Sequence, residues 1–116
     1  MIKKVYRLNE KQTKKVLTAW KPFFSYWIVS NILKNNLGYN RFSIVIWGKS
    51  VVNNVTRNFF RRQYFSITWD FIKTKDNAWV DFVCFVKKQT KLDKKNIESI
   101  KTFQKDIKFL IYKNNI

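Results

Sequence analysis

The sequence predicts an α+β fold in a single domain. Three observations support this fold class: helical patterns open and close the chain, β-branched and aromatic runs lie between them, and one further amphipathic segment interrupts those runs. A length of 116 residues is close to the commonest size of one domain, so we expect residues 1–116 to share one core. Hydrophobic residues make up 46% of the chain, which is too much for a disordered basic tail.

The first half of the chain predicts one helix followed by two strands. Residues 9–20 carry apolar side chains at helical spacing among lysines, and the only proline, Pro22, follows them. Residues 24–33 and 42–47 are rich in β-branched and aromatic side chains, and the segment 34–40 between them has the composition of a turn. We therefore expect two antiparallel strands in this half.

A middle helix is predicted to follow the second strand and to extend to about residue 70. Val52, Val55 and Phe59 fall on one side of it, and we expect this side to dock on the sheet. Within this segment, residues 64–72 also suit a strand, so the sequence leaves both structures open there.

The remaining chain predicts a strand and a closing helix. The strand is expected near residues 78–86, where only Asp81 breaks an apolar and aromatic run. Residues 90–93, with the sequence Thr-Lys-Leu-Asp, resemble a capping box. Apolar residues then recur at helical spacing, at Ile97, Ile100, Phe103, Ile107, Leu110 and Ile111. The chain is therefore expected to end in a long amphipathic helix.

Positive charge is the strongest compositional feature of the chain. Lysine and arginine total 24 residues against 7 Asp and Glu, which gives a formal net charge of +17. This charge opposes compaction of the chain alone, whereas contact with phosphates releases counterions and stabilises a complex. We therefore expect a polyanionic partner. The alternative is a lysine-rich surface set by genomic base composition, but such a bias does not cluster arginines.

The residues that enzymes use most often are scarce. The chain has no histidine, so no imidazole can act as a general acid or base near neutral pH. Its seven acidic residues are scattered and its two glycines form no phosphate-binding loop. The single cysteine, Cys84, lies in an apolar run typical of a buried thiol. We expect no catalytic residue and no metal site in the protein.

Membrane contact and export are not expected either. No segment approaches 18 consecutive apolar residues, and the polar sequence after Met1 lacks the apolar core of a signal peptide. We expect a cytoplasmic protein with no obligate protein partner.

Three of the five arginines lie within one short part of the middle helix. Hydrogen-bonding side chains occur there at i, i+3, i+4 and i+7, with one more at the edge of the row. These residues, here called the arginine stripe, are Asn54, Arg57, Asn58, Arg61 and Arg62. Guanidinium groups bind phosphate through paired hydrogen bonds or stack on bases, and asparagine reaches phosphate, sugar or base edges. The stripe therefore predicts a nucleic-acid contact; the alternative is a solvated helix face.

The sequence around the stripe resembles the signature of the protein component of bacterial ribonuclease P, roughly K-x-x-G-N-x-V-x-R-N-x-x-[KR]-R. The matching positions are Lys49, Asn53, Val55, Arg57, Asn58, Arg61 and Arg62. Length, charge and element order agree with the family over about residues 7 to 113. The chain departs from the pattern at Val52, where the family has glycine, at Ser50, the usual second lysine, and at Phe59, commonly a basic residue.

This resemblance implies a small α/β sandwich, with a mostly antiparallel sheet packed with helices and a left-handed βαβ crossover that is an exception to the usual handedness. It implies a non-catalytic protein subunit, whose partner RNA cleaves the 5′ leader from precursor tRNA with Mg²⁺. The protein would bind that catalytic RNA and the precursor tRNA. The residues assigned to RNA binding are Lys49, Asn53, Asn54, Arg57, Asn58, Arg61 and Arg62.

In this family the leader runs through a cleft between the first helix and the sheet. The residues assigned to that cleft are Leu17, Trp20, Tyr26, Val29 and Asn31. The usual phenylalanines of the first helix are Thr13 and Leu17 in this chain, and Asn31 replaces an aromatic residue. Trp20, Tyr26 and Trp27 could stack on unpaired bases instead, although core packing is the alternative for all three.

Two other functions stay open on the sequence. A basic ribosomal protein that binds structural RNA would have the same charge and size, and so would a DNA-binding module.

Overall fold

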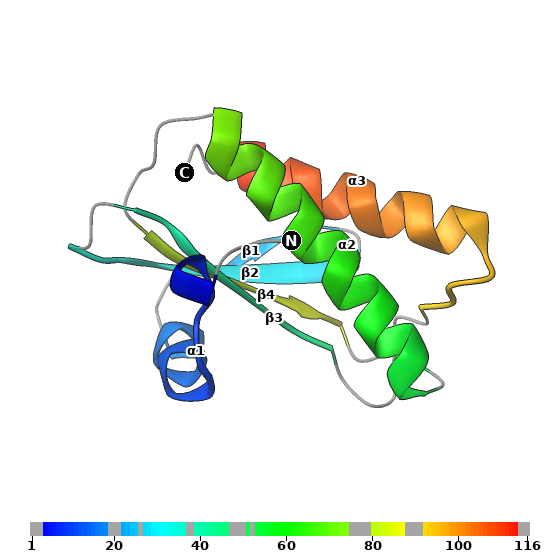
Figure 1. The fold of residues 1–116 in the computed structure, drawn as a ribbon, viewed down its shortest axis with the longest axis horizontal. Coiled ribbons are helices and arrows are strands. Elements are labelled where there is room, and N and C mark those ends of the chain that lie inside the picture. Colours follow the sequence, from blue (N-terminus) through cyan, green and yellow to red (C-terminus); the bar gives the residue numbers. More distant parts are fainter. Residues whose placement is uncertain are drawn as a thin grey trace.

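A four-stranded sheet lies between two layers of helices (Figure 1). The computed structural model describes residues 4–18, 22–25, 27–36, 39–46, 51, 53–74, 80–87 and 92–113. Its elements are the 3-10 helix η1 (Lys4–Tyr6), α1 (Glu10–Leu17), β1 (Pro22–Phe24), β2 (Ile28–Lys34), β3 (Arg41–Val45), α2 (Asn54–Thr74), β4 (Val80–Val86) and α3 (Ile97–Lys113). Helices α2 and α3 cover one face of the sheet and α1 covers the other. The predicted α+β class is confirmed.

The strand order is β1-β2-β4-β3. β1 and β2 are antiparallel, β2 and β4 are antiparallel, and β3 runs parallel to β4, with α2 as the connection between these last two strands. The expected mostly antiparallel sheet is therefore confirmed. The two strands predicted in the first half run in opposite directions, but β4 lies between them. The first of the two is also divided into β1 and β2 by a turn in which the Ser25 N–H donates to the Ile28 carbonyl at 2.8 Å.

Alternate residues of β4 enter different cores. Phe82 and Cys84 face α2 and α3 in the larger core, whereas Val83 packs with Leu8 and Val16 beneath α1. Both sides of the strand are thus buried, which explains its nearly continuous apolar sequence. Cys84 is the buried thiol that the sequence predicts, and burial raises its pKa.

The side of α2 that docks on the sheet differs from the prediction. Phe60, Tyr64 and Phe71 are fully buried, whereas Val55 is 57% exposed and Phe59 reaches only the edge of the core. Aromatic rings bury more apolar area than valine does, so they set the rotation of the helix about its axis. The prediction that the valines at the start of the helix face the sheet is therefore wrong for Val55.

Helix α2 is also longer than predicted. It ends at Thr74, and residues 64–72, which also suited a strand, are helical. Val52 lies outside the described residues.

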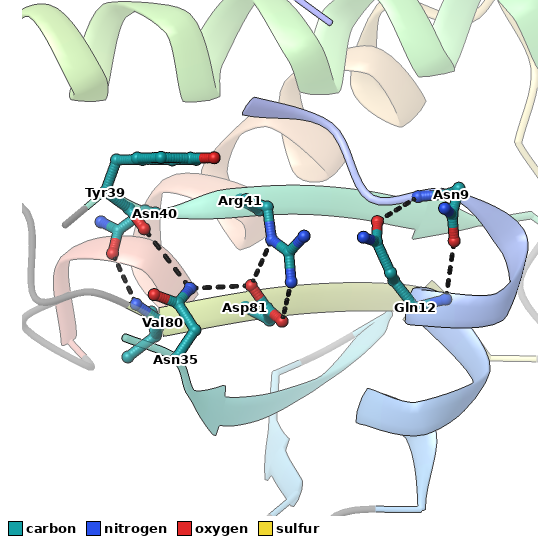
Figure 2. Close-up of polar contacts among 8 residues, drawn as sticks. All are labelled: Asn9, Gln12, Asn35, Tyr39, Asn40, Arg41, Val80 and Asp81. Atoms are coloured by element: carbon teal, nitrogen blue, oxygen red, sulfur yellow. Dashed lines mark hydrogen bonds and ion pairs between the residues drawn. The ribbon is translucent and has the colours of Figure 1, made fainter. Parts of the chain in front are cut away.

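Asp81 breaks the apolar pattern of β4 because it holds a buried ion pair (Figure 2). Arg41 donates from Nε to Oδ1 at 2.8 Å and from Nη2 to Oδ2 at 2.7 Å, and the Asn35 side-chain amide donates to Oδ1 at 2.8 Å. The hydrogen bonds from Arg41 to Asp81, together with the negative charge of Asp81, raise the pKa of Arg41. The neighbouring Asn40 accepts the Val80 N–H at 2.9 Å. The cluster ties the connection between β2 and β3 to the start of β4.

An asparagine caps the N-terminus of α1, and another caps the N-terminus of α3. Asn9 accepts the Gln12 N–H at 2.8 Å, and the Gln12 side chain accepts the Asn9 N–H at 2.9 Å, so the pair forms a capping box at α1 (Figure 2). Helix α1 ends at Leu17, earlier than the predicted residue 20.

Helix α3 begins later than predicted. Asn96 Oδ1 accepts the N–H groups of Glu98 at 3.0 Å and Ser99 at 3.4 Å, so Asn96 is the capping residue. The prediction of a helix start at residues 90–93 is therefore wrong; residues 90 and 91 lie outside the described part, and a turn follows Asp93.

Candidate nucleic-acid interface

The arginine stripe begins at the N-terminus of α2. Asn53 caps the helix, because its Oδ1 accepts the Thr56 N–H at 2.9 Å and its carbonyl accepts the Arg57 N–H at 3.1 Å. Asn54 Oδ1 accepts a hydrogen bond from Arg57 Nη1 at 2.7 Å. This bond fixes the direction of the Arg57 guanidinium on the helix surface.

Asn58, Arg61 and Arg62 continue the stripe over the next two turns, and all three are exposed. Arg62 Nε donates to the Asn58 carbonyl at 3.3 Å, which holds its side chain along the helix. Within the described part of the chain, no carboxylate lies at ion-pair distance from Arg57, Arg61 or Arg62. Their positive charge is therefore not neutralised by the groups that the structure describes.

A fourth arginine, Arg7, joins the stripe from the other side. Arg7 and the later part of the stripe line a hollow of about 440 Å³, here called the basic hollow. Its walls are Arg7, Asn58, Arg61, Arg62 and Phe65. Arg7 is placed there because its backbone bridges to Phe42 on β3, and the Leu8 N–H donates to the Phe42 carbonyl at 2.9 Å. The segment η1 is thus held beside the sheet and opposite α2.

Two of these guanidinium groups keep a donor without an acceptor. Nε of Arg7 and Nε of Arg57 are buried and have no hydrogen-bond partner among the described residues. A buried donor without an acceptor is unfavourable in the free protein. These two atoms are buried, so the donors open to a ligand are those of the exposed Arg61 and Arg62, and phosphate oxygens have the matching chemistry.

A second hollow, of about 420 Å³, lies between α1 and β3 and is here called the α1 hollow. Its walls are Leu8, Asn9, Glu10, Thr13, Lys14, Leu17, Ser43, Ile44, Val45 and Arg61. Inside it, Thr13 Oγ1 donates to Ser43 Oγ at 3.0 Å. Arg61 lines both hollows, and a smaller recess between them shares Arg7, Leu8 and Ser43, so the depression is continuous.

The structure describes three of the five residues assigned to a leader cleft, Leu17, Val29 and Asn31. Leu17 lines the α1 hollow. Val29 and Asn31 are buried on β2, where the Asn31 side-chain amide donates to the Leu17 carbonyl at 3.2 Å and so holds the end of α1 against the sheet. Trp20 and Tyr26 lie outside the described residues, as does Lys49 of the RNA-binding set.

Sequence reasoning did not assign Arg7 or Ser43 to the site. Arg7 is one of only five arginines, and this scarcity was the signal that could have drawn attention to it. Its contact with α2 depends on the pairing of η1 with β3, which is not visible in local patterns. Ser43 had no such signal.

Chemically, the exposed arginines of this surface are suited to bind a polyanion. No group of three or more His, Cys, Asp or Glu that could hold a metal ion occurs within the described residues. Tyr64 is wholly buried, and burial raises the pKa of its phenol well above the ordinary value. None of the helices in the described ranges is long and apolar enough to cross a membrane.

Comparisons with known proteins agree with this architecture. No protein-family model and no curated sequence match the chain. The Staphylococcus aureus RNase P protein matches in structure with a TM-score of 0.71 at 16% identity, over 92% of this chain and 93% of that chain. A mutant of the S. aureus protein with defective mRNA degradation activity matches with a TM-score of 0.71 at 18% identity, over 95% and 90%.

A third match comes from Thermotoga maritima. Its RNase P protein, in complex with 1-(4-fluorophenyl)-2-thiourea, has a TM-score of 0.65 at 20% identity and covers 84% of this chain and 89% of that chain. The agreement in three structures, each over most of both chains, establishes that this chain has the fold of the bacterial ribonuclease P proteins.

Proposed function

We propose that this chain is the protein subunit of ribonuclease P, a ribonucleoprotein endoribonuclease that removes the 5′ leader of precursor tRNA. The observation that carries the proposal is the convergence of Arg7, Arg61 and Arg62 on one hollow of a domain with the RNase P protein fold. In this proposal the partner RNA performs the cleavage, and the protein binds and positions RNA.

The arginine stripe and Arg7 form the contact with the catalytic RNA. Arg7, Arg61 and Arg62 line the basic hollow, Arg57 lies one turn earlier on α2, and no carboxylate of the described residues is at ion-pair distance from the three arginines on α2. Folded RNA presents closely spaced phosphates, and each bidentate contact needs a guanidinium of fixed direction. The bonds that hold Arg57 and Arg62 along the helix meet this requirement.

The 5′ leader of precursor tRNA occupies the α1 hollow. Arg61 stands where this hollow joins the basic hollow, so a strand bound along α1 would continue from RNA bound at the stripe. Leu17 offers an apolar contact, and Thr13, Ser43 and Lys14 offer polar ones. Asn31 acts indirectly, because its side-chain amide holds the end of α1 against the sheet, and Val29 is buried on the same strand. A contact of Trp20 or Tyr26 with leader bases belongs to the same proposal.

The chemistry is divided between the two subunits. This chain has no histidine, and the buried carboxylates of Asp81 and Asp106 are engaged by Arg41 and by the Trp27 backbone N–H. Mg²⁺ is therefore assigned to the RNA subunit, where it would supply the activated nucleophile and stabilise the leaving oxygen. The positive charge of the protein reduces the repulsion between the catalytic RNA and the precursor tRNA. In this proposal the protein acts in the cytoplasm.

Reconstitution tests this division. Purified protein alone should leave precursor tRNA uncut, whereas addition of the RNA subunit encoded by the same genome should give specific 5′ cleavage. This activity should appear at Mg²⁺ concentrations where the RNA alone is poor, because the added positive charge replaces part of the screening by cations. The measurement is the fraction of labelled leader released across a Mg²⁺ titration.

Polylysine is the control for charge without structure. It should activate the RNA subunit less than the protein does and should not sharpen the choice of cleavage position. Specific leader removal by protein freed of RNA would contradict the proposal, as would activation no greater than that by polylysine.

A further inference from the structure

A third hollow, with aromatic walls, lies where α3 meets the β1 edge of the sheet, at the opposite edge from Arg7. It encloses about 460 Å³ and is lined by Phe24, Ser25, Thr102, Lys105, Asp106 and Phe109. Phe24 is 63% exposed and Phe109 is 42% exposed, so two aromatic side chains at one hollow remain open to solvent. Exposed aromatic side chains gathered at one hollow are more informative than single exposed apolar residues, because apolar patches mark interaction sites.

The position of this hollow is fixed by contacts between the β1–β2 turn and α3. The Trp27 N–H donates to Asp106 Oδ2 at 2.8 Å, which joins the turn to the helix. Lys87 Nζ donates to the Ser25 carbonyl at 2.9 Å and lies 5.9 Å from the centre of the Phe24 ring. The walls therefore come from elements that are held together, and we call this site the α3 hollow.

The α3 hollow is separate from the basic hollow. β1 and β3 are the two edges of the sheet, since the strand order is β1-β2-β4-β3. Three inter-strand spacings amount to about 14 Å between these edges. The α3 hollow lies at the β1 edge, whereas Arg7 is held at the β3 edge. One unpaired nucleotide cannot occupy both.

Positive charge surrounds the aromatic rings. Lys101, Lys105 and Lys108 are exposed on α3 at i, i+4 and i+7, and Lys105 lines the hollow itself. The one carboxylate in the wall, Asp106, is buried and accepts the Trp27 backbone N–H. The open surface is thus basic and aromatic together. That combination is typical of sites where unpaired bases stack and phosphates contact lysine.

We infer that the α3 hollow binds an unpaired segment of RNA, with a base stacked on Phe24 or Phe109 and its phosphates beside Lys105 and Lys108. Charge decides the occupant: with a net charge of +17, a second copy of this chain would be repelled, whereas a polyanion is attracted. This site goes beyond the proposed contacts of the stripe and the α1 hollow. It gives the protein a second RNA contact on a different edge of the sheet.

The test measures binding of a fluorescent octauridylate to protein that carries Arg61→Ala and Arg62→Ala, so that the stripe does not mask the second site. In this background, Phe24→Leu with Phe109→Leu should weaken octauridylate binding by about fivefold or more, since leucine fills space without stacking. Binding of inorganic polyphosphate, which has no bases, should change by less than about twofold, because every cation remains.

Charge is tested by a matched pair of variants. Lys105→Gln with Lys108→Gln should weaken octauridylate binding more than Lys94→Gln with Lys95→Gln, which removes the same charge from the turn before α3. Photocrosslinking of an oligonucleotide that contains 5-iodouridine should label the peptides with Phe24 or Phe109. The melting temperature of each variant checks that it is folded.

Three results would overturn the inference: no octauridylate binding in the Arg61→Ala, Arg62→Ala background, equal losses for octauridylate and polyphosphate in the phenylalanine variant, or self-association that this variant abolishes. These results are separate from a failure of the proposed function. That function depends on catalytic RNA and precursor tRNA bound at the stripe and the α1 hollow, whereas this experiment uses neither RNA and lacks Arg61 and Arg62.

Discussion

Replacement of Arg61 and Arg62 by alanine together should weaken binding of the catalytic RNA by about 30-fold to 1,000-fold. Each charge-assisted contact contributes roughly 1–3 kcal/mol, and two neighbouring contacts add incompletely. Both side chains are exposed, and among the described residues neither pairs with a carboxylate, so the free energy of unfolding should change by less than about 0.5 kcal/mol. Filter binding at several salt concentrations gives both the affinity and its salt dependence.

The salt dependence separates specific contacts from diffuse attraction. Loss of two phosphate contacts should reduce the slope of log affinity against log salt by about 1.4 to 1.8. The matched control is Lys94→Ala with Lys95→Ala, which removes the same charge from exposed positions before α3. If both double variants weaken binding equally and slightly, the arginine stripe is a solvated surface and the RNA contact lies elsewhere.

Asp81→Ala should have the largest effect on stability, with a loss of about 3–5 kcal/mol in the free energy of unfolding. The substitution removes the acceptor for both Arg41 bonds and for the Asn35 amide, and it leaves a guanidinium in a largely buried position. The cluster also joins β3 to β4, the parallel pair that α2 must connect. Urea denaturation followed by circular dichroism measures the change.

Asp70→Ala is the control for this prediction. Asp70 lies 3.6 Å from Lys73 on the exposed side of α2, where an ion pair contributes less than about 1 kcal/mol. Both variants remove one negative charge, so net charge cannot account for a difference between them. Equal losses for the two variants would show that the buried pair contributes no more than a surface pair does.

Local patterns predicted the elements because each pattern reflects burial that the structure retains. The spacing of Phe103, Ile107 and Leu110 marks the buried side of α3, and the apolar run before and after Asp81 marks the central strand. The arginine stripe could be placed on one helix face for the same reason. The distance between the stripe and the nearest carboxylate could not be predicted from the sequence, because it depends on the packing of other elements.

Features that depend on contacts between distant parts of the chain could not be predicted from the sequence. The insertion of β4 between β2 and β3 follows from strand pairing across many residues, which no local pattern encodes. The docking side of α2 was misassigned because helical spacing alone does not rank Val55 against Phe60 and Tyr64. Arg7 joins the basic hollow only because η1 pairs with β3.

Sequencing of the RNA that co-purifies with the native protein tests the central claim most directly. The account predicts that the catalytic RNA of ribonuclease P is the most enriched species, with precursor tRNA as a minor one. Both should be lost from the Arg61→Ala, Arg62→Ala protein purified at the same yield. Enrichment of ribosomal RNA in place of the catalytic RNA would contradict the account, and so would enrichment that the double substitution leaves unchanged.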